Sequence, residues 1–300
     1  MGARRIAERP LVSPWAGIAL GVAAVSSASI FVRLSSAPPL VIATYRMTFA
    51  TLMLGPSAIL QGRRELLSIN KRDFASSLLA GGFLAVHFGA WMTSLSHTSV
   101  ASSVVLVSMH PLLVMLGGRL LLGEPARVGA IAGAAVAVVG SALIGLGDSS
   151  TGGNALFGDL LALLSAFMFA GYVLVGRRVR QRLSVCPYAF LVYGMCSCIL
   201  AIACLTSGAR LYPHTERDFM LFLGLAVVPT ILGHTVFNWA LRYVSASVIS
   251  VSALGEPVGA TFLAMVFLKE LPPATAVAGG TLVLAGILLF TLFSHQTPST

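Results

Sequence analysis

Apolar segments long enough to cross a bilayer occupy most of this 300-residue chain. A membrane-spanning helix needs about 20 mostly apolar residues. Ten segments qualify: residues 14–33, 39–61, 73–95, 99–121, 126–147, 156–178, 187–208, 218–241, 247–268 and 272–293. Only 10% of the residues are charged, whereas about 25% are charged in a typical soluble domain. The sequence therefore predicts an all-α integral membrane protein with ten transmembrane helices.

The basic residues are distributed unevenly among the connecting loops. If the N-terminus is cytoplasmic, fourteen of the nineteen Lys and Arg residues lie on the cytoplasmic side and four on the outer side. An excess of positive charge in cytoplasmic loops is the usual pattern in membrane proteins. This explains the net charge of +9 without nucleic acid as a partner. We expect a multi-pass protein of a bacterial inner membrane, with both termini in the cytoplasm and the lipid bilayer as its surroundings.

The second part of the chain repeats the pattern of the first at an offset of 146 residues. The matched pairs are Pro111 and Pro257, Glu124 and Glu270, Gly133 and Gly279, and Gly140 and Gly286. The repeat divides the chain into two five-helix halves, residues 1–147 and 148–300. Because five is an odd number, the second half should be inverted in the membrane. Inverted repeats are typical of secondary transporters, which bind their substrates near the membrane midplane.

Each half places an ionisable residue directly before a proline inside an apolar segment. These pairs are His110–Pro111 in the first half and Glu256–Pro257 in the second. Proline removes a backbone donor and breaks the helical turn, and in lipid the freed groups require protein or a water-filled cavity. Intramembrane charges have the same requirement. We expect both segments to line a central cavity, with Pro111 and Pro257 as gating bends. The alternative is a simple kink with a hydrogen-bonded glutamate.

Two more segments carry polar and aromatic side chains at helical spacing. His87 and Trp91 are four residues apart, as are His234 and Asn238, and Trp239 follows. Residues four apart share one helix face, and pockets for small molecules combine aromatic walls with a few polar groups. These five residues, with the two ionisable residues before the prolines, are the candidates for the substrate cavity. In the alternative interpretation, the histidines bond neighbouring helices and the tryptophans anchor the interface.

Three other charged residues are expected to be structural. Arg46 can extend to the membrane surface or pair with a buried acid, whereas Glu124 and Glu270 close equivalent segments of the two halves. The four cysteines have no metal-ligand pattern around them and are interpreted as buried thiols. Motifs for nucleotide binding, metal-dependent hydrolysis and nucleophilic catalysis are missing from the sequence. We therefore expect no enzymatic activity, no direct use of ATP, no cofactor and no metal.

Taken together, these features resemble the EamA family of the drug/metabolite transporter superfamily. The residues that carry the resemblance are Pro111, Glu124, Gly133, Gly140, Pro257, Glu270, Gly279 and Gly286, with Arg46 matching a basic residue near the start of the second helix. Within the family, the chain is most similar to bacterial aromatic amino-acid exporters. The resemblance implies an amino-acid exporter of the inner membrane. It also implies a cavity lined by the segments 14–33, 73–95, 99–121, 156–178, 218–241 and 247–268, with 126–147 and 272–293 outside it.

The resulting expectation is a secondary transporter that exports amino acids by alternating access. The few charges among the cavity candidates favour aromatic and other neutral amino acids with broad specificity. A multidrug or cationic-metabolite exporter of the same superfamily, with Glu256 or a histidine as proton carrier, is the alternative. A monomer is expected, although several pairs of glycines spaced four residues apart leave an oligomer open.

Overall fold

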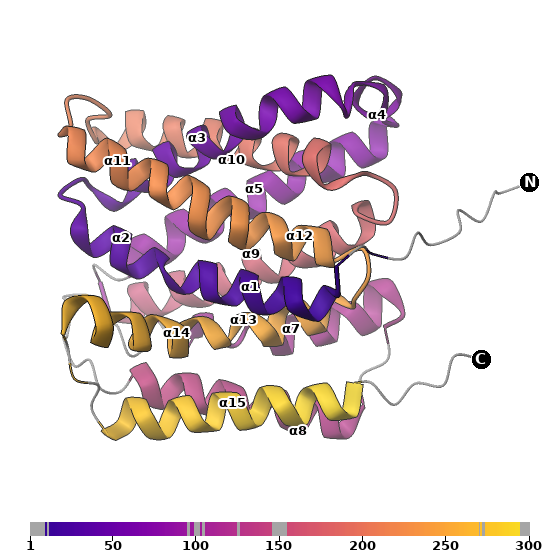
Figure 1. Ribbon diagram of the computed structural model, residues 1–300, viewed down its shortest axis with the longest axis vertical. Helices are drawn as coiled ribbons and strands as arrows, with labels where there is room; N and C mark the ends of the chain where they lie inside the picture. Colours follow the sequence, from indigo (N-terminus) through magenta and orange to yellow (C-terminus); the bar gives the residue numbers. More distant parts are fainter. Residues whose placement is uncertain are drawn as a thin grey trace, which may run out of the picture.

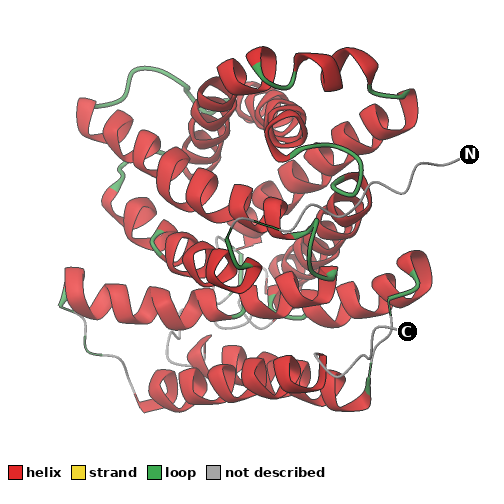
Figure 2. Ribbon diagram, turned by 45° about the vertical axis from the view of Figure 1, so that its right-hand side comes forward, coloured by secondary structure: helices red, strands yellow, loops and turns green. Residues whose placement is uncertain are grey.

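The computed structural model describes residues 10, 12–94, 97–98, 103, 106–124, 127–145, 155–269, 271 and 274–294. Every regular element within these ranges is a helix (Figures 1 and 2). Seven of the described helices are long and apolar enough to cross a membrane. The prediction of an all-helical membrane protein is confirmed, while the number of ten transmembrane helices stays a prediction.

The helices follow one another along the chain with short connections. Their bounds are α1 (Pro14–Ser26), α2 (Ala28–Leu34), α3 (Pro39–Leu60), α4 (Arg63–Ser68), α5 (Lys71–Ser94), α7 (His110–Gly117), η1 (Gly118–Leu122), α8 (Val128–Gly145), α9 (Ala155–Val179), α10 (Val185–Ser207), α11 (Glu216–Leu225), η2 (Ala226–Thr235), α12 (Val236–Ala240), α13 (Ala246–Ala253), α14 (Gly255–Leu263), η3 (Ala264–Leu268) and α15 (Ala274–Ser294).

Both predicted proline breaks are visible in the backbone. Residues 108–109 form a turn, and α7 begins at His110 with Pro111 in its first turn. In the same way α13 ends at Ala253, and α14 begins two residues later, at Gly255, with Pro257 in its first turn. Proline is tolerated there because the first N–H groups of a helix have no partner within that helix. At the second break the chain therefore forms two short helices, α13 and α14, in place of one long helix.

Three stretches widen into π-helical turns. Two of them, η1 and η3, end at a residue in the left-handed conformation, Gly123 with φ 68° and Lys269 with φ 57°. The third, η2, carries Thr230 and Thr235, whose hydroxyls donate to carbonyls five residues earlier, at 2.8 and 3.1 Å. π-turns are rare and often occur at functional sites. We therefore expect η2 to lie close to the functional site.

Two glycine-rich helices, α8 and α15, lie side by side at one end of the molecule (Figure 1). A Cβ on Gly140 would lie 2.6 Å from the carbonyl oxygen of Gly279, and one on Gly286 would lie 2.7 Å from that of Gly133. Only glycine allows two backbones to come this close. The two pairs also show that the helices run antiparallel, because residue numbers rise along one helix as they fall along the other.

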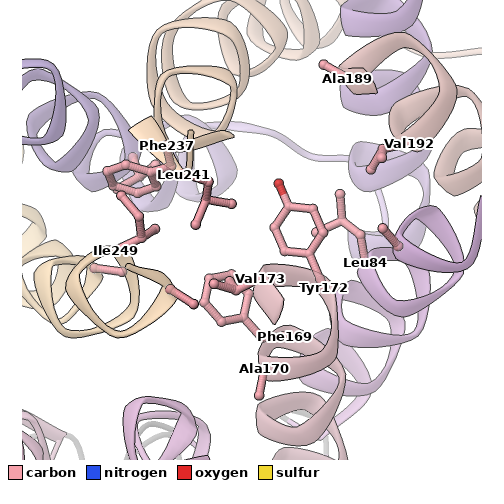
Figure 3. Packing of buried hydrophobic residues seen from close by; sticks show 14 of the residues in the cluster. Leu84, Phe169, Ala170, Tyr172, Val173, Ala189, Val192, Phe237, Leu241 and Ile249 are labelled. Atoms are coloured by element: carbon pink, nitrogen blue, oxygen red, sulfur yellow. The ribbon is translucent and has the colours of Figure 1, made fainter. Parts of the chain in front are cut away.

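Buried side chains of α5, α9, α10, α12 and α13 join in the main apolar cluster. Figure 3 shows Phe169 and Tyr172 of α9 close together, between Leu84 of α5 and Phe237 of α12. All four side chains are buried. This cluster connects the two halves of the chain and supports the polar groups described below.

The prediction of four buried thiols is wrong in part. Cys196 and Cys204 are buried, whereas Cys186 is half-buried and Cys198 is exposed on α10. A thiol is apolar enough to face lipid, so the exposed position has a small cost in a membrane.

Candidate substrate site

Arg46, for which the sequence predicts a structural role, is buried inside the helical bundle. Its side chain is only 5% exposed. The Nε–H donates to Thr230 Oγ1 of η2 at 2.7 Å, and the guanidinium carbon lies 5.0 Å from the centre of the Phe88 ring. The π-turn positions the threonine, and the aromatic face attracts the cation. Helices α3, α5 and η2 thus hold the guanidinium in one orientation.

His87 and His110 both pack against Phe169. The ring centre of Phe169 is 5.0 Å from that of His87 and 4.6 Å from that of His110. His87 Nδ1 is hydrogen-bonded to Ser165 Oγ at 2.8 Å, and His110 Nδ1 to Ser250 Oγ at 2.6 Å. One nitrogen of each imidazole therefore connects two neighbouring helices, as the alternative interpretation of the histidines expects. Both imidazoles also contact the same phenylalanine ring.

Asn238 is fully enclosed and its amide is occupied by two tyrosines. Its Oδ1 accepts from Tyr172 OH at 2.9 Å and its Nδ2 donates to Tyr193 OH at 3.4 Å. Tyr193 OH is also 3.0 Å from Thr235 Oγ1. The side chain is 1% exposed, so we assign it to the supporting network rather than to the cavity wall. The sequence did not point to the tyrosines, because nothing in their apolar surroundings marks them as partners of Asn238.

Glu256 differs from the other ionisable residues of the bundle interior. It is half-buried in the first turn of α14. Among the described residues its carboxylate accepts no hydrogen bond and lies within ion-pair distance of no basic group. It interacts electrostatically with Arg46. An unpaired carboxylate is costly in a membrane unless water or a ligand reaches it.

The other predicted cavity residues occupy different positions. His234 is half-buried, and its ring centre is 6.1 Å from that of Phe88. Trp91 packs against the main apolar cluster. Trp239 lies against Gly17 of α1, with its ring centre 5.1 Å from that of Tyr243, and it also packs against the main apolar cluster.

Electrostatic interactions connect the charged and titratable residues. Arg46 acts on Glu256, His87 and His234, and His87 acts on His110. These five side chains come from α3, α5, α7, η2 and α14. The structure thus brings together four of the seven cavity candidates, His87, His110, His234 and Glu256, and adds Arg46, Phe88 and Phe169 to them. We call this set the central cluster.

The sequence predicts structural roles for Glu124 and Glu270. Glu124 accepts from Arg177 Nε at 2.9 Å and from the backbone N–H of Ala246 at 3.2 Å, so it connects three segments at one end of the bundle. Glu270 lies outside the described residues. Within the described residues, no group of three or more His, Cys, Asp or Glu side chains is placed to hold a metal ion.

The fold and the central cluster define a multi-pass membrane protein with polar groups enclosed in a helical bundle. The profile of the EamA-like transporter family matches residues 8–146 and, a second time, residues 156–292. These matches cover most of the chain, which belongs to this family of transporters and not to a family of enzymes.

Three relatives illustrate the range of the family. Transporter YxxF of Bacillus subtilis is 27% identical over 84% of this chain and 80% of its own length. A probable terminal-alkyne amino-acid exporter of Streptantibioticus cattleyicolor is 26% identical over 81% of each chain. The pseudopaline exporter CntI of Pseudomonas aeruginosa is 26% identical over 84% of this chain and 85% of its own length.

A solved crystal structure has the same fold. It superposes with a TM-score of 0.79 at 16% identity and covers 94% of this chain and 97% of the other.

Proposed function

We propose that this transporter exports amino acids, mainly aromatic and other neutral ones, without using ATP directly. The observation that carries the proposal is the unpaired carboxylate of Glu256, which lies inside the bundle beside a helix break and in electrostatic contact with Arg46. The histidines of the central cluster pack against the rings of Phe88 and Phe169. Such a site suits a small molecule with a charged end and an apolar body. Two relatives that carry exporter names support the outward direction.

The proposal includes ten helices arranged as two inverted repeats, residues 1–147 and 148–300. The same family profile matching twice supports a repeat. The glycine contacts support its symmetry. An offset of 146 converts the pair Gly140–Gly279 into Gly286–Gly133, and the two approaches are 2.6 and 2.7 Å. Because α8 and α15 are antiparallel, a two-fold axis relating them crosses the helices and lies in the membrane plane, as inverted repeats require.

The two helix breaks are proposed as the bending points of alternating access. Each half contains a short helix that starts beside its proline, at Pro111 or Pro257. Both short helices end in a π-turn followed by a left-handed residue, at positions 123 and 269. Matched breaks allow either half to tilt while the core of packed helices stays intact. We place the protein in a bacterial inner membrane, as a monomer, with both termini in the cytoplasm.

A second candidate function follows from the charge of Glu256. A carboxylate in the membrane interior attracts cations, so export of cationic metabolites or drugs, with or without proton coupling, is the rival. The positive charge of Arg46 close to Glu256 opposes it, because a cation at the site would be repelled by the guanidinium.

Counterflow in proteoliposomes separates the two functions. Purified protein is loaded with unlabelled phenylalanine, and labelled phenylalanine, threonine, lysine or tetraphenylphosphonium is offered outside without an ion gradient. Uptake of the labelled neutral amino acids is expected. Uptake of the lipophilic cation alone would overturn the proposal in favour of the rival. If a folded protein takes up none of the labelled compounds, both proposed functions are rejected.

A further inference from the structure

The guanidinium of Arg46 has N–H donors that no described protein group accepts. Its Nε–H is bonded to Thr230, but among the described residues Nη1 and Nη2 have no protein acceptor. In the described part of the chain, the fully buried polar side-chain atoms without a hydrogen-bond partner are Ser141 Oγ and Tyr188 OH. The two Nη atoms of Arg46 are not among them, so neither is fully buried. The side chain as a whole is nevertheless 95% buried. An arginine fork without a partner inside a membrane protein is costly, and a fixed fork is suited to a carboxylate.

Glu256 is in the complementary situation. The residue is half-buried, its carboxylate is unpaired among the described residues, and Arg46 is the charged group that acts on it. The two side chains are nevertheless more than ion-pair distance apart, because the ion pairs among the described residues are Arg177–Glu124 and Arg182–Asp73. Opposite charges in a low-dielectric interior attract strongly. The helices that carry them therefore keep the two charges beyond ion-pair distance, so that neither neutralises the other.

The residues around this pair have assigned tasks. Thr230 fixes the Nε edge of the guanidinium, and Phe88 covers its face. The imidazoles of His87 and His110 are tied to serines. Among the described residues of the central cluster, the outer edge of Arg46, the imidazole of His234 and the carboxylate of Glu256 have no hydrogen-bond partner. Of these three groups, Arg46 and Glu256 are the pair with opposite charges.

We propose that Arg46 and Glu256 together bind the two charged ends of a zwitterionic α-amino acid. The Nη groups of Arg46 donate to the substrate carboxylate, and Glu256 accepts from the substrate ammonium. The side chain of the substrate then lies on the aromatic wall of Phe88 and Phe169. This inference rests on the proposed function and specifies its substrate class. It also gives Arg46 a second task besides the structural one.

Three ligands that differ at one end each test the assignment. Phenylalanine has both charged ends, phenethylamine lacks the carboxylate, and 3-phenylpropanoate lacks the ammonium. Binding of each labelled ligand to the purified full-length chain is measured by scintillation proximity. For the wild type we expect both analogues to bind roughly 10- to 100-fold more weakly than phenylalanine, as the loss of a charge-assisted hydrogen bond implies.

Each variant should weaken the binding of only one charged end of the ligand. Arg46→Gln is expected to weaken phenylalanine binding to the level of phenethylamine while leaving phenethylamine unchanged. Glu256→Gln should do the same with respect to 3-phenylpropanoate. If Arg46→Gln does not fold, Arg46→Lys serves in its place, because it keeps the charge and loses the two-pronged donor. Thr51→Val is the matched control, because Thr51 lies on the same helix as Arg46 and its hydroxyl donates to the backbone carbonyl of Met47, outside the central cluster.

The outcomes are distinct. Equal weakening of phenylalanine and phenethylamine in Arg46→Gln or Arg46→Lys would overturn the assignment and leave Arg46 structural. Loss of the preference for phenylalanine in Thr51→Val would overturn it as well, because the preference would then not depend on the Arg46 fork. If the wild type binds and transports phenylalanine but does not prefer it to either analogue, this inference fails while the proposed function survives. If no amino acid binds or moves in counterflow, the proposed function itself fails.

Discussion

The two helix breaks have the same backbone form but opposite side-chain environments. At the first break, His110 is buried, bonded to Ser250 at 2.6 Å and packed against Phe169. At the second break, Glu256 is half-buried, and no described residue donates to its carboxylate. One break is closed by protein, whereas the other carries a carboxylate without a partner among the described residues, which we expect water or a ligand to reach.

This difference teaches that proline placement decides where a helix bends but not what the bend does. The neighbours decide the latter, and they come from distant parts of the chain. Ser250 lies 140 residues after His110. A symmetric scaffold can therefore carry an asymmetric site, with binding in one half and packing in the other.

The largest expected effect distinguishes the two breaks by their part in transport. Glu256→Gln should lower phenylalanine counterflow by roughly 10- to 100-fold, because a charge-assisted hydrogen bond to the ligand is lost. Its melting temperature should stay level or rise, since an unpaired charge leaves the membrane interior. Counterflow and a thermal melt of the same preparation measure both.

A large fall in melting temperature together with lost counterflow would contradict this expectation. It would mean that Glu256 supports the fold, as Glu124 does through Arg177.

The next effect tests whether the scaffold around the two breaks is symmetric. Gly140→Ala and Gly286→Ala each place a methyl group against a backbone carbonyl, at 2.6 and 2.7 Å. Overpacking of this kind costs about 1–3 kcal/mol, and the two variants should lose similar stability. Gly89→Ala is the control, because a Cβ there meets nothing within 4 Å. Unfolding in a denaturant series in detergent measures all three.

Unequal losses at the two paired positions would argue against equivalent halves. Equal losses that Gly89→Ala shares would show a general effect of replacing glycine in these helices.

The smallest effect concerns the closed break alone. Ser250→Ala removes the hydroxyl bonded to His110, which should cost about 1 kcal/mol of stability. Counterflow should be largely retained, because the bond holds α7 to α13 and does not contact the ligand. A strong loss of counterflow in a stable Ser250→Ala protein would place His110 at the substrate.

Much of the scaffold could be read from the sequence because it follows from local rules. Long apolar runs predict spanning helices, and Pro111 and Pro257 stand where helices α7 and α14 begin. The spaced glycines that brought out the repeat are those at which α8 and α15 touch. The π-turns had no comparable signal, because their apolar residues suit an ordinary helical turn equally well.

The site was harder to predict because its properties depend on partners far away in the chain. Asn238 was a cavity candidate from its polarity, yet Tyr172 and Tyr193 use its amide. Arg46 was expected to be structural, and its contact with Thr230 fits that role. Its free Nη groups depend on which acceptors lie near, and the sequence does not contain that information.

The openness of the second break is tested most directly by chemical labelling of the native chain in liposomes. A small membrane-permeant carbodiimide modifies reachable carboxyl groups, diethyl pyrocarbonate modifies reachable histidines, and peptide mass spectrometry locates both. We expect Glu256 to be modified and saturating phenylalanine to slow the reaction, while His110 stays unmodified. An unreactive Glu256, or a rate that phenylalanine leaves unchanged, would contradict the assignment of the substrate site to the second break.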